Sequence, residues 1–263
     1  KMIKILANDG ISKAGIDALT AKGFNIITEH VAQDDLIDTI KTENYEVLLV
    51  RSATNVRKDL IDACPHLKIV GRGGVGMDNI DVEYAREKGV NVINTPAASS
   101  SSVAELVFAH LFGMVRFLFD SNRQMPMTGD ADFKGLKKSY AKGKELAGKT
   151  LGIIGFGRIG QEVAKRAIGL GMNVMAHDKF IEEASITLDF FNGDKKSFTI
   201  ETESLEKVLK NADFVTLHIP KIGDKPVIGA EQIGMMKTGA GIVNAARGGV
   251  IDETALMFAL DKE

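Results

Sequence analysis

The chain has 263 residues, of which 44% are hydrophobic and 26% charged, and its formal net charge is −2. It contains no block of Lys and Arg that would favour nucleic acid or an anionic membrane surface, and no apolar run of about 18 residues that would span a bilayer. The single cysteine, Cys64, excludes an internal disulfide and a thiolate metal cluster. We therefore expect a cytoplasmic globular protein without a metal site, of one large domain or two of about 100–150 residues each.

The first third of the chain alternates short apolar runs with amphipathic segments. The runs predict strands, and the segments predict helices that end at glycine or proline. Strands are expected at 3–6, 24–28, 47–50, 67–70 and 90–94, and helices at 13–22, 34–42 with Asp34 as N-cap, 59–64 and 81–88. This rhythm of strand and helix favours a parallel sheet.

The rhythm breaks after residue 94. Residues 95–102 are small or proline and predict a linker, 103–119 predict a long apolar helix, and the polar, lysine-rich stretch 129–149 predicts a surface excursion. We therefore expect an α/β protein with two doubly wound parallel-sheet domains, flavodoxin-like over 1–96 and Rossmann-like over 97–263. Ligands of open α/β sheets bind at the carboxyl ends of the strands, so the cleft between the domains is the expected site.

A glycine-rich turn follows the apolar run 151–154. Gly155, Gly157 and Gly160 have the G-x-G-x-x-G spacing, the next residues have a helical apolar face that ends at Gly171, and a second strand over 173–177 ends at Asp178. The glycines allow a tight turn, a close approach of backbone to pyrophosphate and close helix–strand packing. Asp178 would accept hydrogen bonds from the ribose hydroxyls and repel a 2′-phosphate. The stretch predicts an NAD site, against the plainer interpretation of a structural α/β turn.

The rest of the chain is less regular. Residues 181–204 are weakly patterned, and we expect helices at 205–210, 231–236 and 253–260 and strands at 214–218 and 241–244. Arg247 follows the last of these strands, where it could polarise a substrate carbonyl and hold its carboxylate.

Two features of the first domain favour an anion. Arg51 follows the buried strand 47–50, where it could hold a phosphate or a carboxylate, although a surface ion pair is an equal alternative. Four glycines in 71–76 would let backbone N–H groups converge on a small carboxylate, although a strained turn without a ligand is also possible. None of the five histidines has a neighbouring carboxylate that would mark it as a general base.

Together these motifs resemble the D-2-hydroxyacid dehydrogenase family over essentially the whole chain. The matching stretches are VRSAT (50–54), VGRGGVGMDNID (70–81), NTP (94–96), SVAEL (102–106), GKTLGIIGFGRIG (148–160), Asp178, HIP (218–220) and NAARGGVIDE (244–253). The resemblance implies an NAD-dependent oxidoreductase, a substrate domain before residue 97, and a long helix that supports a homodimer.

The resemblance also implies roles for individual residues. Arg247 would be the catalytic, substrate-binding arginine, and Arg51 and Ser52 would favour a phosphorylated 2-hydroxy acid. The loop Gly73, Gly74 and Val75 would hold the substrate carboxylate. The implied NAD contacts are Val75 at the nicotinamide end, Arg158 and Ile159 at the pyrophosphate, Asp178 at the ribose, His218, Ile219 and Pro220 around the adenosine, Ala245 and Ala246 by the nicotinamide, and also Arg247.

The implied reaction is the oxidation of 3-phospho-D-glycerate to 3-phosphohydroxypyruvate, the entry to serine synthesis. The alternatives are a glyoxylate or hydroxypyruvate reductase of the same family and, more remotely, a non-catalytic NAD-sensing protein. One departure matters: the family's catalytic Glu and His lie beyond the ARGG motif, and this sequence stops at Glu263 before either position. We therefore expect the chain to be incomplete and to bind NAD but turn over poorly.

Overall fold

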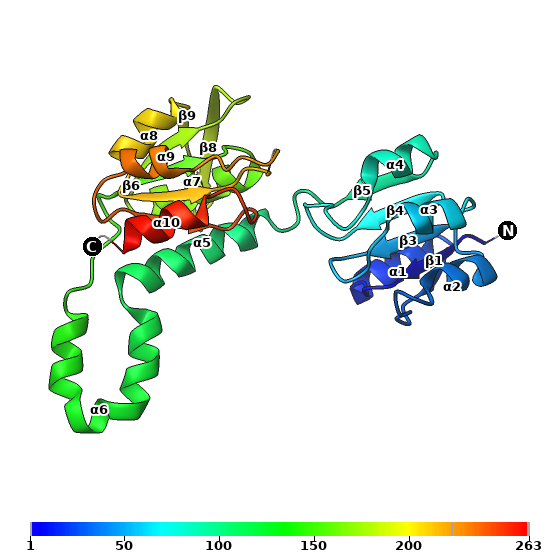
Figure 1. The fold of residues 1–263 in the computed structure, drawn as a ribbon, viewed down its shortest axis with the longest axis horizontal. Helices are drawn as coiled ribbons and strands as arrows, with labels where there is room; N and C mark the ends of the chain where they lie inside the picture. Colours follow the sequence, from blue (N-terminus) through cyan, green and yellow to red (C-terminus); the bar gives the residue numbers. More distant parts are fainter. Residues whose placement is uncertain (1, 222, 262–263) are drawn as a thin grey trace. The chain divides into compact units, whose positions relative to one another are not determined.

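The computed structural model describes residues 2–221 and 223–261 and divides the chain into two units, Lys1–Ser99 and Ser100–Glu263. Each unit is built on its own parallel sheet (Figure 1). The fold class predicted from the sequence, α/β with two parallel-sheet domains, is confirmed. We call the two parts unit 1 and unit 2.

Unit 1 is a five-stranded sheet with strand order β2-β1-β3-β4-β5, in which all neighbours are parallel. Its strands are β1 (Lys4–Ala7), β2 (Asn25–Ile27), β3 (Val47–Val50), β4 (Ile69–Arg72) and β5 (Asn91–Asn94). Its helices are α1 (Lys13–Ala21), α2 (Leu36–Glu43), α3 (Lys58–Ala63) and α4 (Val82–Glu87). The strand order reverses beside β1, as in flavodoxin-like sheets.

The core of unit 1 lies between the sheet and three of its helices. Leu6, Leu48 and Val70 come from neighbouring strands and are fully buried, and they belong to one cluster with Leu36 of α2 and Leu60 of α3. Because the carboxyl ends of the parallel strands share one edge, the loops that follow β1, β3, β4 and β5 gather there.

Unit 2 is a four-stranded parallel sheet with strand order β11-β10-β6-β7. The strands are β6 (Thr150–Ile154), β7 (Asn173–His177), β10 (Phe214–Leu217) and β11 (Gly241–Asn244). The helices are α5 (Ser100–Val115), α6 (Leu118–Tyr140), α7 (Arg158–Gly169), α8 (Leu205–Asn211), α9 (Ala230–Met235) and α10 (Glu253–Leu260). The chain leaves β6 towards β7 and later returns on its other side as β10, so the order switches beside β6.

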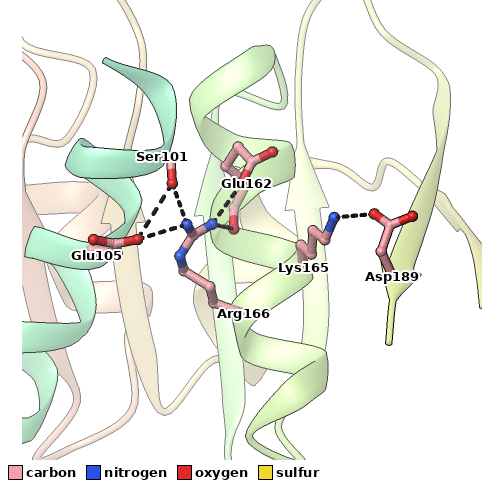
Figure 2. Close-up of polar contacts among 6 residues, drawn as sticks. All are labelled: Ser101, Glu105, Glu162, Lys165, Arg166 and Asp189. Carbon is pink, nitrogen blue, oxygen red and sulfur yellow. Dashed lines mark hydrogen bonds and ion pairs between the residues drawn. The ribbon is translucent and has the colours of Figure 1, made fainter. Parts of the chain in front are cut away.

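Helix α5 is fastened to α7 by one arginine (Figure 2). Arg166 donates to the Ser101 hydroxyl and to Glu105 Oε1, at 3.1 Å, on α5, and to Glu162 Oε2, at 2.6 Å, on its own helix. On the face of α5 that is turned to the core, Ala104, Phe108 and Leu111 are buried. Hence the helix that opens unit 2 is integral to its core.

Several predicted boundaries in this region were wrong. Residues 100–102, expected in a linker, form the first turn of α5, and the helix expected over 103–119 breaks at Phe117, which has a left-handed φ of 55°. The polar stretch 129–149, expected as a surface excursion, continues in α6 as far as Tyr140, with a non-helical residue at Asp132, and α6 has no buried residue. In unit 1 the N-cap of α2 is Asp35, without a side-chain cap bond, rather than Asp34.

The weakly patterned residues 181–204 contain an antiparallel hairpin, which the sequence did not predict. Strands β8 (Glu183–Asp189) and β9 (Lys195–Glu201) pair with each other outside the main sheet. Ile186 is buried against the core of unit 2, and Lys165 of α7 makes an ion pair of 2.8 Å with Asp189 (Figure 2). The outward residues opposite one another are polar, such as Thr187 and Ser197, so the apolar alternation is too weak to mark the strands.

Among the residues that the structure describes, no single helix is long and apolar enough to cross a membrane. One bent pair, α5 with α6 at 57°, satisfies length and composition only when the two helices are taken together.

Candidate functional site

The glycine turn of unit 2 lies where three strand ends meet. Gly155 follows β6 with a φ of +94°, and its N–H donates to the carbonyl of His177, at the end of β7, over 2.8 Å. A Cβ at Gly155 would lie 2.6 Å from the carbonyl oxygen of His218, just after β10. The turn therefore occupies the switch point of the sheet, where open α/β folds bind their ligands.

The N-terminus of α7 leaves room for an anion. Its N-cap is Gly157, no side chain in the described part of the chain caps it, and its first turn contains no acidic residue. A Cβ at Gly157 would meet no heavy atom within 4 Å, whereas one at Gly160 would run into the carbonyl oxygen of Gly155. Free N–H groups and the positive end of the helix dipole face this space, which suits a pyrophosphate.

Asp178 is held against the same turn. Its Oδ2 accepts from the N–H of Phe156 at 2.7 Å, and its Oδ1 accepts from the N–H groups of Phe180 and Ile181 at 2.8 and 3.2 Å. Burial alone would raise the pKa of this carboxyl, but the three backbone donors outweigh it and hold the pKa below its ordinary value. An ionised carboxylate at this position accepts hydroxyl donors and repels a phosphate.

His218 is uncharged at neutral pH. Its burial lowers the pKa of the imidazole to about 4, and its Nε2 lies 3.0 Å from the hydroxyl of Thr216. Nδ1 is buried and has no hydrogen-bond partner among the described residues. Ile219 packs against Gly155, so the structure brings His218 and Ile219 to the glycine turn.

Arg247 sits on a tight loop after β11. The side chain of Asn244 shapes this loop: its Oδ1 accepts from the N–H of Ala246 at 3.1 Å and its Nδ2 donates to the carbonyl of Arg247 at 2.8 Å. Arg247 itself is exposed and donates to the carbonyl of Ala246 at 2.8 Å. The structure thus places Ala245, Ala246 and Arg247 at the carboxyl edge of the sheet that also carries the glycine turn.

Unit 1 has a cavity of about 660 Å³ at its own carboxyl edge. It contains two of the predicted substrate residues, Arg51 and Gly73, whereas Ser52, Gly74 and Val75 are not among its lining residues. The polar part of the lining is Asp9, Ser12, Arg51, Arg72, Asn94 and Thr95, and the apolar part comes from Ile11, Leu49, Val50 and Ile93.

The loop that carries Arg51 is held by Asp9. Oδ2 of Asp9 accepts from the N–H groups of Arg51 and Thr54 at 2.6 and 3.1 Å, and Oδ1 accepts from the Thr54 hydroxyl at 2.6 Å. Burial tends to raise the pKa of Asp9, but these bonds prevail and lower it. The carboxylate of Asp9 is therefore ionised, and both of its oxygens accept hydrogen bonds from the loop that carries Arg51.

The two glycines of the neighbouring loop make space for two arginines. A Cβ at Gly73 would lie 3.5 Å from Cγ of Arg51, and a Cβ at Gly74 would lie 2.5 Å from Nη1 of Arg72. Any larger residue at Gly74 would displace the Arg72 guanidinium. Two cations thus share one cavity with two hydroxyls, an amide and the Asp9 carboxylate, whose oxygens accept from Arg51 and Thr54, and this arrangement suits a small anion.

The sequence interpretation missed Asp9, Arg72 and Asn79 as residues of this site. The rule that pointed to Arg51 also applies to the first two, because Asp9 closely follows β1 and Arg72 is the last residue of β4. Asn79 gives no such signal: it lies in a loop, and only the tertiary contacts bring it to Arg51 and Arg72.

The chain matches one protein-family model and is similar in sequence to several named proteins. Residues 108–263 match the model of the D-isomer specific 2-hydroxyacid dehydrogenase NAD-binding domain. The chain is 41% identical to a hydroxypyruvate reductase from Thermotoga maritima, over 96% of this chain and 77% of that protein. It is 42% identical to a D-3-phosphoglycerate dehydrogenase from Methanocaldococcus jannaschii, over 98% of this chain and 47% of that one.

One solved structure that is similar to this chain is an NAD⁺-bound 3-phosphoglycerate dehydrogenase from Entamoeba histolytica. It superimposes with a TM-score of 0.74 at 27% identity, over all of this chain and 78% of the other. The chain thus spans about half the length of the phosphoglycerate dehydrogenase from Methanocaldococcus jannaschii and roughly three quarters of the other two proteins.

Proposed function

Because the chain belongs to the D-isomer specific 2-hydroxyacid dehydrogenase family, we propose that it oxidises 3-phospho-D-glycerate to 3-phosphohydroxypyruvate with NAD, at the start of serine biosynthesis. The observation that carries the choice of substrate is the pair Arg51 and Arg72 in the cavity of unit 1. A phosphate dianion needs more positive charge than the small carboxylates of related substrates, and two arginines supply it.

A second candidate is the reduction of hydroxypyruvate or glyoxylate. It is favoured by the 41% identity to the Thermotoga protein, which extends over 77% of that protein's length. These substrates carry no phosphate, so the two candidates differ in how much they need Arg51.

Unit 2 fits NAD. The uncapped N-terminus of α7, with Gly157, Arg158 and Ile159, would hold the pyrophosphate, and Asp178 would accept the ribose hydroxyls. His218, Ile219 and Pro220 would line the adenosine side, and Ala245 and Ala246 the nicotinamide side. When bound, NAD accepts a hydride from the carbon that bears the hydroxyl group. Arg247 would hold the substrate carboxylate and polarise the forming carbonyl.

The proton of the hydroxyl group needs an acceptor, and His218 is a poor one because its burial lowers its pKa to about 4 and so makes the imidazole a weak base. The resemblance to the family places the acceptor, a histidine tuned by a glutamate, beyond Arg247, and the sequence contains no histidine after His218. The chain spans 77% of the Thermotoga protein and 47% of the Methanocaldococcus protein, and we propose that the acceptor lies in a part of the family fold outside these 263 residues.

The direct test is NADH formation from 3-phospho-D-glycerate, measured for this chain and for a version extended through the natural C-terminus. We expect both to bind NAD and only the longer one to turn over. Activity of the 263-residue chain would contradict the assigned position of the proton acceptor. If both versions bind NAD and neither oxidises the phosphorylated acid, the substrate proposal is wrong.

We also propose that the protein is a homodimer in which a second copy covers α6. This helix has no buried residue. It forms a helical hairpin that projects from the rest of unit 2 (Figure 1). Phe119, Met127 and Phe133 on it are 71%, 77% and 53% exposed. The legs of the hairpin are tied by the hydroxyl of Tyr140, which donates to Asp120 over 2.7 Å. So much exposed apolar surface on one projecting element favours a protein partner.

We expect the double variant Phe119→Asp, Phe133→Asp to convert a dimer into a monomer, because each charge would be buried in the contact between the two copies. Light scattering coupled to size exclusion measures the mass directly. Phe191→Asp is the matched control, since Phe191 is more exposed than either phenylalanine but lies at the tip of the β8–β9 hairpin. A dimer that survives the double change, or a wild-type monomer, would contradict the proposal.

A further inference from the structure

Asn79 connects the two arginine-bearing loops of unit 1. Its Nδ2 donates to the carbonyls of Arg51 and Thr54 at 2.8 and 2.6 Å, and its Oδ1 accepts from Nε of Arg72 at 2.8 Å. The residue is only 8% exposed and is not among the lining residues of the cavity. One buried amide thus satisfies two carbonyls on one loop and a guanidinium on the other.

These bonds hold the backbone of Arg51 and the Nε atom of Arg72 in place. The peptide groups around Arg51 are held on both sides, since its N–H donates to Asp9 at 2.6 Å while its carbonyl accepts from Asn79. The guanidinium of Arg72 is held at Nε, which donates to Asn79. Its Nη1 lies beside Gly74, in the space that a Cβ there would occupy. Asn79 is the residue that bonds to both.

We propose that Asn79 is the positioning residue of the anion site in unit 1, which sets Arg51 and Arg72 at one separation before the substrate arrives. This inference rests on the proposed function, because it concerns the same site. It requires an amide in particular: only a side chain that both donates and accepts can join two carbonyls to a guanidinium. Arginines fixed in advance lose less conformational freedom on binding, so the acid binds more tightly.

The variant Asn79→Asp distinguishes a positioning role of Asn79 from a contribution to the stability of the fold. The carboxylate has the same size and still accepts from Arg72, but it turns two hydrogen bonds into repulsion between oxygens and so releases the loop of Arg51. Asn91→Asp is the matched control, because Asn91 is exposed on β5 of the same unit. The enzyme to be used is the C-terminally extended protein, with NAD and the acid varied separately.

We expect the KM for the acid to rise by about 10- to 100-fold in Asn79→Asp, with kcat and the KM for NAD within about threefold of wild type. Asn91→Asp should change none of the three. The Nε–H resonance of Arg72 should persist in Asn79→Asp and shift in Asn79→Ala, since only aspartate retains the acceptor. A fall in kcat and thermal stability without a selective rise in the KM for the acid would overturn the proposal.

A second variant covers the case in which Asn79→Asp does not fold. Thr54→Val keeps the shape of a residue that is 3% exposed and removes the hydroxyl that binds Asp9 and Asn8, so it loosens the same loop without touching Arg72. We expect a smaller selective rise in the same KM, and an unchanged KM would overturn the proposal. A wild type that is inactive on 3-phospho-D-glycerate would refute the proposed function. The inference is then tested on the acid that the wild type does turn over, for which Asn79→Asp should raise the KM by as much as Arg51→Gln does, and an effect of Arg51→Gln without one of Asn79→Asp would overturn it.

Discussion

Gly155→Ala should abolish useful NAD binding and destabilise unit 2. Gly155 has a φ of +94°, which costs an L-residue strain, and the new Cβ would lie 2.6 Å from the His218 carbonyl oxygen and 2.8 Å from Cγ2 of Ile219. Because both neighbours are anchored beside β10, the turn has to move. We expect a loss of about 2–4 kcal/mol in the free energy of unfolding and a Kd for NADH raised by about 100-fold or more.

The matched control is Gly169→Ala, the same substitution near the end of α7. A Cβ there meets no heavy atom within 4 Å, and alanine is the better helix former. It should leave NADH binding unchanged and stabilise the protein by up to about 1 kcal/mol. Urea unfolding and fluorescence titration with NADH measure the two effects. Wild-type affinity in Gly155→Ala would mean that the switch point of the sheet is not where the cofactor binds.

Arg51→Gln should distinguish the two candidate substrates. If Arg51 binds a phosphate group, its loss removes a charge-assisted bond worth about 1.5–3 kcal/mol, which corresponds to a KM for 3-phospho-D-glycerate about 10- to 100-fold higher. Hydroxypyruvate and glyoxylate have no phosphate, so their KM values should change by less than about threefold. Steady-state kinetics of the C-terminally extended protein with each acid measure this difference.

Arg86→Gln serves as the control for loss of an arginine, because Arg86 lies on α4 of the same unit, outside the lining of the cavity, and pairs with Glu83 at the surface. It should leave all three KM values unchanged. Equal losses on phosphorylated and unphosphorylated acids in Arg51→Gln would argue against phosphate recognition and favour the reductase. Unchanged kinetics on every acid would remove Arg51 from the site.

The parallel strands could be predicted because short apolar runs alternate regularly with amphipathic segments along the chain. β3 and β7 lie where the sequence placed them, and Gly23, Gly89 and Gly171 end helices with positive φ values as expected. The hairpin β8–β9 and the helical character of α6 were missed for one physical reason. Both elements are largely solvent-exposed, so neither leaves a strong apolar period in the sequence.

The sequence alone determined the local geometry of the cofactor turn. Glycine spacing, the strand before it and the acid at Asp178 are properties of a short stretch, because steric limits on the backbone act between near neighbours. The same reasoning located Arg51 and Arg247 at strand ends. The hydrogen-bond partners of Asp178 could not be predicted in this way, because the N–H of Phe156 reaches its carboxylate only when β6 and β7 pair.

Only the tertiary structure decided which residues act together. Arg51 lies on a different loop from Arg72 and Asn79, and no spacing rule relates Asn79 to either arginine. Pairing of β3 with β4 brings Val50 opposite Arg72 and lets one amide reach both loops. Contacts of this kind depend on strand order and loop path, which are set by burial of the whole core. Sequence spacing fixes conformation over a few residues, and packing of the core fixes which distant residues share a site.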